Sequence, residues 1–278
     1  MQGLTESIRT NAAATTCIVL SVGILAACGT KPNETATDET TTSASDKLIM
    51  GTNAAFPPFE FVTTNGLVDK YDGIDVAIAL KIAEKAGKTL EVSDMEFDGL
   101  IAAVSTGKVD MAVAGMTVTE ERKQNVDFSD TYYVAEQVIV VAEDNTDITN
   151  AESLKDGKKV GVVLGYTADS IVTEDLALDD ANIVRANRGI DVVQDVKNGK
   201  LDAVVIDSYT GKKLAEMNGL KVIEDPEAFT AEEYAIAVKK GNTELLDVIN
   251  ETLAEMKESG EIEELAASYN DSTVEETE

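Results

Sequence analysis

The chain of 278 residues contains no histidine and no tryptophan, and its only cysteines are Cys17 and Cys28. Without histidine, neither a Ser-His-Asp nor a Cys-His arrangement can form, and metal sites built on imidazole are excluded. Both cysteines lie near the N-terminus, so the rest of the chain carries no thiol. We therefore expect no metal and no cofactor, and catalysis starts with few of its usual residues.

Positive charge is also scarce. The chain has 23 lysine and arginine residues against 52 aspartate and glutamate residues, which gives a net charge of −29 at pH 7. So few cations cannot neutralise many phosphates, and nucleic acid is not an expected partner. The charge also disfavours unaided binding to an anionic membrane surface. The length is sufficient for one large domain or for two lobes with cores of their own.

The apolar run from Cys17 to Ala27 is shorter than the ~20 residues of a membrane span and is typical of a signal-peptide core. It ends in Leu25-Ala26-Ala27-Cys28, which resembles the lipobox of bacterial lipoproteins. That resemblance implies a signal peptide over residues 1–27, cleavage before Cys28 and a lipid on its sulfur. An ordinary secretory signal followed by a coincidental cysteine is the alternative.

The segment after the signal peptide is polar. Residues 28–47 are rich in threonine and show no apolar periodicity, so they cannot bury enough surface to offset the entropy lost on ordering. We expect them to tether a folded body to the lipid on Cys28. This places an exported protein at the outer face of the cytoplasmic membrane through a lipid anchor. Residues 271–278 are expected to form an acidic tail.

From Leu48 onward, short apolar runs alternate with amphipathic segments, which predicts an α/β protein with mostly parallel sheets. One internal similarity stands out: Val104–Val113 matches Val196–Val205 at an offset of 92 residues. Both segments have the pattern of a helix end, a glycine and a buried strand. The chain is thus expected to contain two comparable halves, each with a polar loop where ligands bind to open α/β sheets. The same offset places Gly115 opposite Asp207.

The segment Gly115–Arg122 (GMTVTEER) follows the first of these two strands. Thr119 is predicted to be a helix N-cap, and the acidic residues after it suit a first turn. Arg122 does not, because a cation in the first turn faces the positive end of the helix. A bound anion would remove this mismatch, since a guanidinium can bind a carboxylate through two parallel hydrogen bonds. The alternative is a surface ion pair with Asp127 or a nearby glutamate.

Several stretches between residues 47 and 270 resemble, in their order and spacing, the extracellular amino-acid-binding proteins of ABC importers, which form family 3 of the bacterial solute-binding proteins. The stretches are Gly51–Phe59, Asp72–Asp75, Gly107–Asp110, Gly115–Arg122, Asp127–Asp130, Gly165–Thr167 and Leu201–Asp207. The resemblance implies a two-lobed, periplasmic-binding-protein-like fold of class α/β. Two crossover hinge strands join lobes that close over a small molecule, and the protein is expected to be a monomer.

The resemblance also implies bounds for the lobes. Lobe 1 is expected to comprise residues 48–137 and 233–270, and lobe 2 residues 138–232. The two crossover strands are expected near Gln137–Ala142 and Glu233–Val238.

The resemblance assigns roles around the two main-chain groups of an amino acid. Arg122 resembles the arginine that binds the ligand's α-carboxylate, and Thr117 and Thr167 would add hydroxyl or backbone donors. Asp207 resembles the aspartate that accepts the α-ammonium, together with the Gly115 carbonyl and the Thr117 hydroxyl. The alternative for Asp207 is a helix N-cap, because a helix is expected to begin at the next residue.

Phe56 and Phe97 match positions that enclose the ligand's side chain, although an isolated phenylalanine such as Phe97 is usually a core residue. Asn53 and Val163 depart from common family variants. An acid is frequent at the position of Asn53 in members that take cationic side chains, and lysine occurs at the position of Val163 in glutamine-binding members. Neither specificity is implied. Since Val163 supplies no second cation for an acidic side chain, we expect a polar neutral or cationic L-amino acid.

Two classes of function remain open. The first is a substrate-binding lipoprotein that delivers an amino acid to the permease subunits of an ABC transporter. The second is an enzyme on the same fold, since a few relatives are dehydratases, with Glu60 or Asp98 as acid or base. No histidine, cysteine or lysine stands at a matching position, and a clamp of Arg122 and Asp207 explains the site without chemistry. We therefore favour the binding protein over the enzyme.

Overall fold

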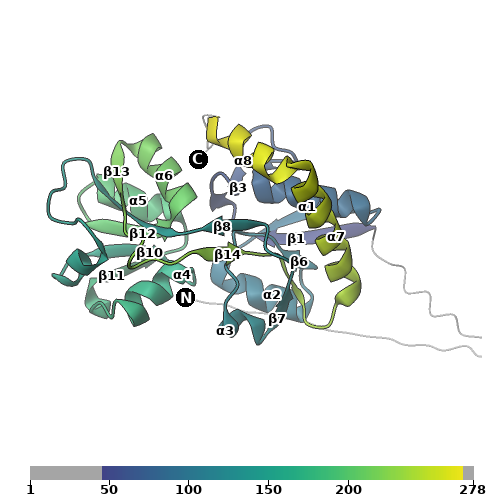
Figure 1. Ribbon diagram of the computed structural model, residues 1–278, viewed down its shortest axis with the longest axis horizontal. Coiled ribbons are helices and arrows are strands. Elements are labelled where there is room, and N and C mark those ends of the chain that lie inside the picture. Colours follow the sequence, from purple (N-terminus) through teal and green to yellow (C-terminus); the bar gives the residue numbers. More distant parts are fainter. Residues whose placement is uncertain (1–45, 272–278) are drawn as a thin grey trace, which may run out of the picture. The chain divides into compact units, whose positions relative to one another are not determined.

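A computed structural model describes residues 46–271 of the chain (Figure 1). The expected signal peptide, the lipidation site Cys28, the tether up to residue 45 and the tail from residue 272 lie outside the described residues. The structure corrects the expected end of the tether and the expected start of the acidic tail. Strand β1 begins at Lys47, whose ammonium pairs with Glu91 of the neighbouring strand at 2.6 Å, so the tether stops before it. At the other end, helix α8 was not predicted and runs to Asp271.

Lobe 1 is built on a five-stranded sheet with the strand order β5-β1-β6-β15-β7. β1 is parallel to β5 and β6, whereas β15 is antiparallel to β6 and β7. Helices α1 and α2 pack on the sheet, and α7 and α8 pack on α1. The bounds are β1 Lys47–Thr52, α1 Ile74–Lys85, β5 Thr89–Asp94, α2 Leu100–Thr106, β6 Met111–Ala112, β7 Val126–Phe128, β15 Ala237–Lys239, α7 Thr243–Ser259 and α8 Glu261–Asp271.

Lobe 2 is built on a second five-stranded sheet with the order β11-β10-β12-β9-β13. β10 is parallel to β11 and β12, whereas β9 is antiparallel to β12 and β13. Helices α5 and α6 both pack against β9 and β12. The bounds are β9 Gln137–Ala142, β10 Val160–Val163, α4 Thr167–Ser170, β11 Ile183–Ala186, α5 Gly189–Lys197, β12 Ala203–Asp207, α6 Ser208–Asn218 and β13 Leu220–Glu224. Short 3-10 or π turns cover Phe97–Gly99, Ala151–Lys155, Ile171–Asp175 and Asp180–Asn182.

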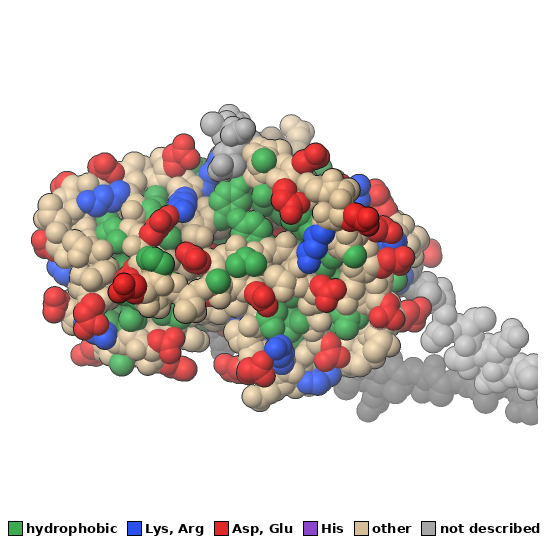
Figure 2. All heavy atoms as spheres, viewed as in Figure 1, with side chains coloured by type: hydrophobic (Ala, Val, Ile, Leu, Met, Phe, Trp, Pro, Cys, Tyr) green, Lys and Arg blue, Asp and Glu red, His purple; other side chains and the backbone are tan. Residues whose placement is uncertain are grey.

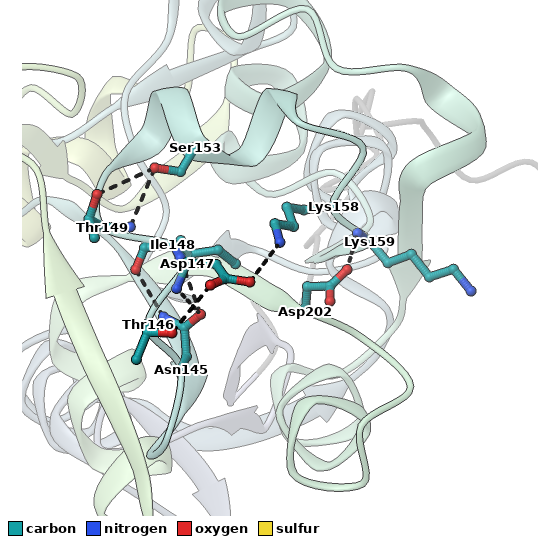
Figure 3. Close-up of polar contacts among 9 residues, drawn as sticks. All are labelled: Asn145, Thr146, Asp147, Ile148, Thr149, Ser153, Lys158, Lys159 and Asp202. Carbon is teal, nitrogen blue, oxygen red and sulfur yellow. Dashed lines mark hydrogen bonds and ion pairs between the residues drawn. The ribbon is translucent and has the colours of Figure 1, made fainter.

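The two sheets have the same order of strand directions, with β6 and β12 as their middle strands. The antiparallel strand comes last along the chain in lobe 1 (β15) and first in lobe 2 (β9). The internal similarity in the sequence reflects this repeat down to single hydrogen bonds. The carboxylate of Asp110, before β6, accepts the N–H of Ile49 at 2.7 Å. The carboxylate of Asp202, before β12, accepts the N–H of Lys159 at the same distance (Figure 3). Each aspartate thus ties the start of a middle strand to the neighbouring parallel strand.

The chain passes between the sheets through two short strands, β8 (Tyr133–Ala135) and β14 (Glu232–Tyr234), which pair antiparallel with each other (Figure 1). This corrects the expected crossover near Gln137–Ala142. That segment is β9 and lies inside the lobe 2 sheet, where five of its six residues are buried. The second expected crossover, Glu233–Val238, covers the end of β14 and the start of β15. The residue bounds proposed for the two lobes stay a prediction.

A small three-stranded sheet, β2 (Ala55–Phe56), β3 (Glu60–Val62) and β4 (Tyr71–Asp72), flanks lobe 1. The prolines between β2 and β3 form the non-helical turn that the sequence predicts. The buried ring of Phe59 packs there against Tyr133, Tyr209 and Tyr234, so aromatic residues fill the space beside the connecting strands.

Acidic side chains are spread over the face shown in Figure 2, as the net charge requires. Over residues 46–271, none of the helices combines the length and apolar character of a membrane span.

Candidate functional site

The segment after β6 folds as a tight loop and a short helix, α3 (Glu120–Lys123). Thr119 is its N-cap, as predicted, and its hydroxyl accepts the N–H of Arg122 at 3.2 Å. Gly115 has a φ of 50°, and a Cβ there would lie 2.6 Å from the ring of Phe56. Only glycine satisfies both the left-handed backbone and this close approach. Its N–H donates to the buried carboxylate of Asp75 at 2.7 Å, which holds the loop in place.

Arg122 extends from α3 across the boundary between the lobes. Its Nη1 donates to the carbonyl of Thr117 in lobe 1 at 2.6 Å, and its Nη2 donates to the carbonyl of Gly165 in lobe 2 at 3.0 Å. The guanidinium also lies over the ring of Phe97, 5.2 Å from its centroid. Burial lowers the pKa of Arg122, while the charges of Asp207 and Glu232 act in the opposite direction.

The expected alternative, a surface ion pair of Arg122, is not what the structure contains. Asp127 accepts the N–H of Gly241 instead, at 2.7 Å. Within residues 46–271, no carboxylate lies within 4.0 Å of the guanidinium nitrogens. The cation therefore contacts neutral carbonyl oxygens and keeps its remaining N–H groups for another acceptor.

Asp207 ends β12 and stands at the N-cap position of α6, but its side chain does not cap that helix. The carboxylate is 3 % exposed and accepts the Nε2 of Gln137 at 3.1 Å and the hydroxyl of Tyr234. Burial, together with the charge of Glu232, raises the pKa of Asp207 to about 7. A buried carboxylate held in this way is poised to accept a cation.

Glu232 is one of two site residues to which the sequence assigned no role. It lies on the connecting strand β14 and is buried. Its Oε2 accepts the hydroxyls of Thr117 and Thr167, both at 2.7 Å, and its Oε1 accepts Gln137 Nε2 at 3.1 Å. Adjacent glutamates at 232 and 233 look alike in the sequence. The one usable signal was the two-residue period of a strand, which turns Glu232 and Tyr234 to the same side.

A third aromatic ring, that of Tyr166, packs against Phe56 and Phe97, the pair expected to enclose the ligand's side chain. Tyr166, in the loop after β10, packs edge-on against Phe56 at 5.4 Å and against Phe97 at 4.5 Å between centroids. Its hydroxyl donates to the Oδ1 of Asn53 at 3.4 Å, and the Nδ2 of Asn53 donates to the carbonyl of Met95. Val163 is buried in the hydrophobic cluster that also contains Phe56, Phe97 and Tyr166. Tyr166 lies in the predicted stretch Gly165–Thr167, but no role was predicted for it, because it follows a glycine in a loop without apolar periodicity.

The predicted site residues lie around one small enclosed space. Its volume is about 10 Å³, enough for roughly one water molecule. It opens beside a larger groove of about 800 Å³ between the lobes, which shares Phe97, Thr117, Arg122 and Thr167 with it. Its lining is Phe56, Phe97, Ala114, Gly115, Thr117, Arg122, Tyr166, Thr167 and Asp207. Of the predicted set, Asn53 alone stands behind this lining, in contact with Tyr166.

The two acids considered for catalysis lie in different surroundings. Glu60 is completely buried beneath the site, and burial together with the charge of Asp75 raises its pKa well above the usual value. Burial also raises the pKa of Asp75, to about 6. Asp98 is exposed at the groove, where it packs closely against Gly165. Within residues 46–271, no three or more acidic or sulfur-bearing side chains lie close enough together to hold a metal ion.

Two α/β lobes, each with polar groups at the end of its middle strand and joined by two short strands, define a class of two-lobed ligand-binding proteins. The fold class predicted from the sequence is thereby confirmed. The chain belongs to family 3 of the bacterial extracellular solute-binding proteins, whose family model matches residues 48–272.

Known proteins similar to this chain bear names of amino-acid-binding proteins. The arginine-binding extracellular protein ArtP of Bacillus subtilis is 38 % identical over 82 % of this chain and 87 % of its own length. A protein of Neisseria gonorrhoeae named "Probable histidine-binding protein" is 33 % identical over 93 % of this chain and 94 % of its own. A solved structure of the substrate-binding protein of an amino acid ABC transporter is 40 % identical, with a TM-score of 0.74, and covers 81 % of this chain and 100 % of that one.

Proposed function

We propose that this protein captures an L-amino acid between its two lobes and delivers it to the permease subunits of an ABC transporter. The observation that carries this proposal is the placement of two opposite charges. Arg122 follows the middle strand of one lobe, Asp207 ends the middle strand of the other, and both line the same small space. An amino acid carries the matching pair of charges on one carbon atom. The names of the similar proteins support the ligand class and the transporter.

The roles follow from which groups retain capacity for hydrogen bonds. Arg122 binds the α-carboxylate through the N–H groups that its two carbonyl contacts leave unused. Asp207 accepts the α-ammonium, together with the Gly115 carbonyl and the Thr117 hydroxyl. Thr167 stands beside this pair on the lobe 2 side.

The ligand's side chain would lie between Phe56 and Phe97, with Asn53 behind them. A space of about 10 Å³ cannot admit it, so the ring of Tyr166 must withdraw when the lobes open. Binding therefore requires movement of the lobe 2 loop that carries Gly165 and Tyr166.

The charges of the site favour a polar neutral or cationic side chain. Among residues 46–271, Arg122 is the only cation that lines the enclosed space, and the α-carboxylate binds to it. Asp207 and Glu232 are both close enough to Arg122 to act on its pKa, so acids outnumber cations around the site. A ligand with an acidic side chain would add another negative charge there. This is the electrostatic reason to expect arginine-like or uncharged polar ligands.

The remaining parts of the proposal concern compartment and assembly. The family is extracellular, so the protein is exported. We further propose that Cys28 carries a lipid after removal of residues 1–27, that the protein acts as a monomer, and that it performs no chemistry on its ligand. The similar proteins reported above are named as binding proteins. Glu60, one of the two acids weighed for catalysis, is completely buried.

A thermal-shift screen of ligand-stripped protein against the twenty amino acids tests the function. One or more polar neutral or cationic L-amino acids should raise the melting temperature, because a ligand at a hundred times its Kd adds about 2.7 kcal/mol to the free energy of unfolding. Calorimetry then measures Kd, and recovery of the unchanged ligand separates binding from catalysis. The proposal fails if none of the amino acids shifts the melting temperature.

A further inference from the structure

The hydroxyl groups of Thr117 and Thr167 are both already used as donors. A threonine hydroxyl has one hydrogen to donate and two lone pairs to accept with. Both hydroxyls donate to the same atom, Oε2 of Glu232, at 2.7 Å. Thr117 belongs to lobe 1 and Thr167 to lobe 2, so one carboxylate oxygen accepts a hydrogen bond from each lobe. Toward the enclosed space that they line, the two oxygens can then only accept.

Glu232 is held firmly in this position. Its carboxylate is buried, which makes its hydrogen-bond partners costly to exchange. Gln137 donates its Nε2 to Oε1 of Glu232 and to Oδ1 of Asp207, both at 3.1 Å, and more weakly to the hydroxyl oxygen of Thr167 at 3.4 Å. Glu232 and Asp207 are thus bridged by one amide group. Thr167 keeps one lone pair for the ligand. The guanidinium of Arg122 bonds to carbonyl oxygens and leaves Glu232 to the threonines and the amide.

We propose that Glu232 is a positioning residue that accepts hydrogen bonds from the hydroxyls of Thr117 and Thr167. Both hydroxyl oxygens then accept from the ligand's α-ammonium, and neither hydroxyl donates to its α-carboxylate. This inference rests on the proposed function and makes it more specific. Arg122 becomes the side-chain donor for the carboxylate. Asp207, the Gly115 carbonyl and the two threonine oxygens form the acceptor set for the ammonium. Glu232 acts through the threonines and does not touch the ligand.

A different role for Glu232 makes the opposite prediction. Its carboxylate could compete with the ligand's own carboxylate for the two hydroxyl donors. Removal of Glu232 would then free these donors and tighten binding. The geometry favours the positioning role, because Glu232 is fixed by Gln137 on a connecting strand and has no need to leave when a ligand enters.

The test compares two ligands that differ only in the α-amino group, L-arginine and its α-deamino analogue, guanidinovaleric acid. Calorimetry gives Kd for the wild type, Glu232→Ala, Glu232→Gln and the control Glu233→Gln, which removes the same charge from the adjacent, exposed position. Glu232→Ala should raise the Kd of L-arginine about tenfold, because the charged α-ammonium loses well-oriented acceptors. The Kd of the analogue should stay within about twofold of the wild-type value. Glu232→Gln should restore part of the loss, because its amide oxygen still accepts from the threonines. Glu233→Gln should match the wild type.

Several outcomes would overturn the inference. If Glu232→Ala weakens the binding of both ligands equally, the role of Glu232 is merely structural. If it tightens the binding of L-arginine, Glu232 competes with the ligand's carboxylate. If Glu232→Ala does not fold, unequal effects of Glu232→Gln on the two ligands decide. Should the wild type bind histidine and not arginine, L-histidine and its deamino analogue replace the pair. A wild type that binds none of the twenty amino acids refutes the proposed function, and this inference falls with it.

Discussion

The ring of Tyr166, from lobe 2, packs edge-on against the ring of Phe97, from lobe 1, with 4.5 Å between their centroids. This contact joins the lobes at the place where the sequence predicts the ligand's side chain. The same ring contacts Phe56, and its hydroxyl reaches Asn53. Tyr166 therefore occupies the space between Phe56 and Phe97, and a ligand's side chain must replace the contacts that Tyr166 makes there. The predictions below follow from this replacement and from the charges around it.

Tyr166→Ala is expected to open the lobes of the ligand-stripped protein. Two aromatic contacts of about 0.5–1.5 kcal/mol each are lost, which lowers the ratio of closed to open molecules by roughly 5- to 160-fold. The radius of gyration from small-angle scattering should increase and return toward the wild-type value with saturating L-arginine, since a ligand held by both lobes favours the closed state. Leu164→Ala, an exposed position in the same loop, is the control. An unchanged radius in ligand-stripped Tyr166→Ala would contradict this account.

Arg122→Ala is expected to abolish high-affinity binding while the fold stays intact. The ligand's carboxylate would lose a charged contact made by two hydrogen bonds, at a cost of about 2–5 kcal/mol. Calorimetry measures the loss, and circular dichroism checks the fold. The control is Lys123→Ala, since Lys123 is the adjacent cation, is exposed and pairs with Glu120. Similar Kd values for Arg122→Ala and the wild type would refute the site.

Acid should weaken ligand binding and stabilise the ligand-stripped protein. The pKa of Asp207 is about 7 in the folded protein and about 3.9 in an unfolded chain. Between these values the folded state holds a proton that the unfolded state has lost, so the free energy of unfolding rises as the pH falls from about 7 to about 4, by up to about 1.4 kcal/mol per pH unit for this group. The buried acids Asp75 and Glu60 act in the same direction. Binding of an ammonium needs ionised Asp207, so Kd should increase below pH 7.

Asp207→Asn is the matched variant for this pH dependence. It removes the titrating group, so the slope of stability against pH should become smaller and Kd should depend less on pH, at a weaker overall affinity. Denaturant unfolding and calorimetry at pH 5, 6, 7 and 8 measure both quantities. If the wild type and the variant show the same slopes, Asp207 does not titrate in this range.

Glutamate and aspartate are expected to compete poorly with a bound cationic or polar neutral amino acid. The site offers Arg122 to the α-carboxylate, while Asp207 and Glu232 repel a second carboxylate. Displacement of labelled L-arginine by an equal concentration of L-glutamate, with L-histidine and L-glutamine in parallel, measures the preference. If glutamate displaces the label best, the interpretation of Val163 and Asn53 is wrong.

Cys28→Ala is expected to release the protein from the membrane or to leave an uncleaved precursor. The reason is the segment Leu25-Ala26-Ala27-Cys28 followed by a polar stretch. Membrane fractionation and the mass of the mature protein give the answer. The control Cys17→Ala changes the other cysteine, inside the expected signal peptide, and should leave both results unchanged. A Cys28→Ala protein with wild-type mass in the membrane fraction would exclude lipidation at this residue.

Several features of the site could be predicted because they depend on local pattern. The N-cap at Thr119 and the proline turn after β2 each follow from a few neighbouring residues. The equivalence of Gly115 and Asp207 follows from an internal repeat at a constant offset, which the shared order of strand directions in the two sheets explains. By contrast, the crossover at Gln137–Ala142 was misplaced, because an apolar run of six residues is typical of a buried strand and the real connecting strands are only three residues long.

By itself, the sequence determined the α/β class and the two halves, because apolar periodicity, glycine positions and repeat spacing are properties of short stretches. The joint role of Arg122 and Asp207 was implied by the family resemblance. Only the tertiary structure decided what surrounds that pair. Tyr166 lies 110 residues from Phe56 and Glu232 lies 115 residues from Thr117, so their contacts exist only once the lobes pack against each other. A threonine hydroxyl donates its hydrogen bond to the acceptor that the fold brings within reach. That choice is made by the packing of distant segments, and no local pattern encodes it.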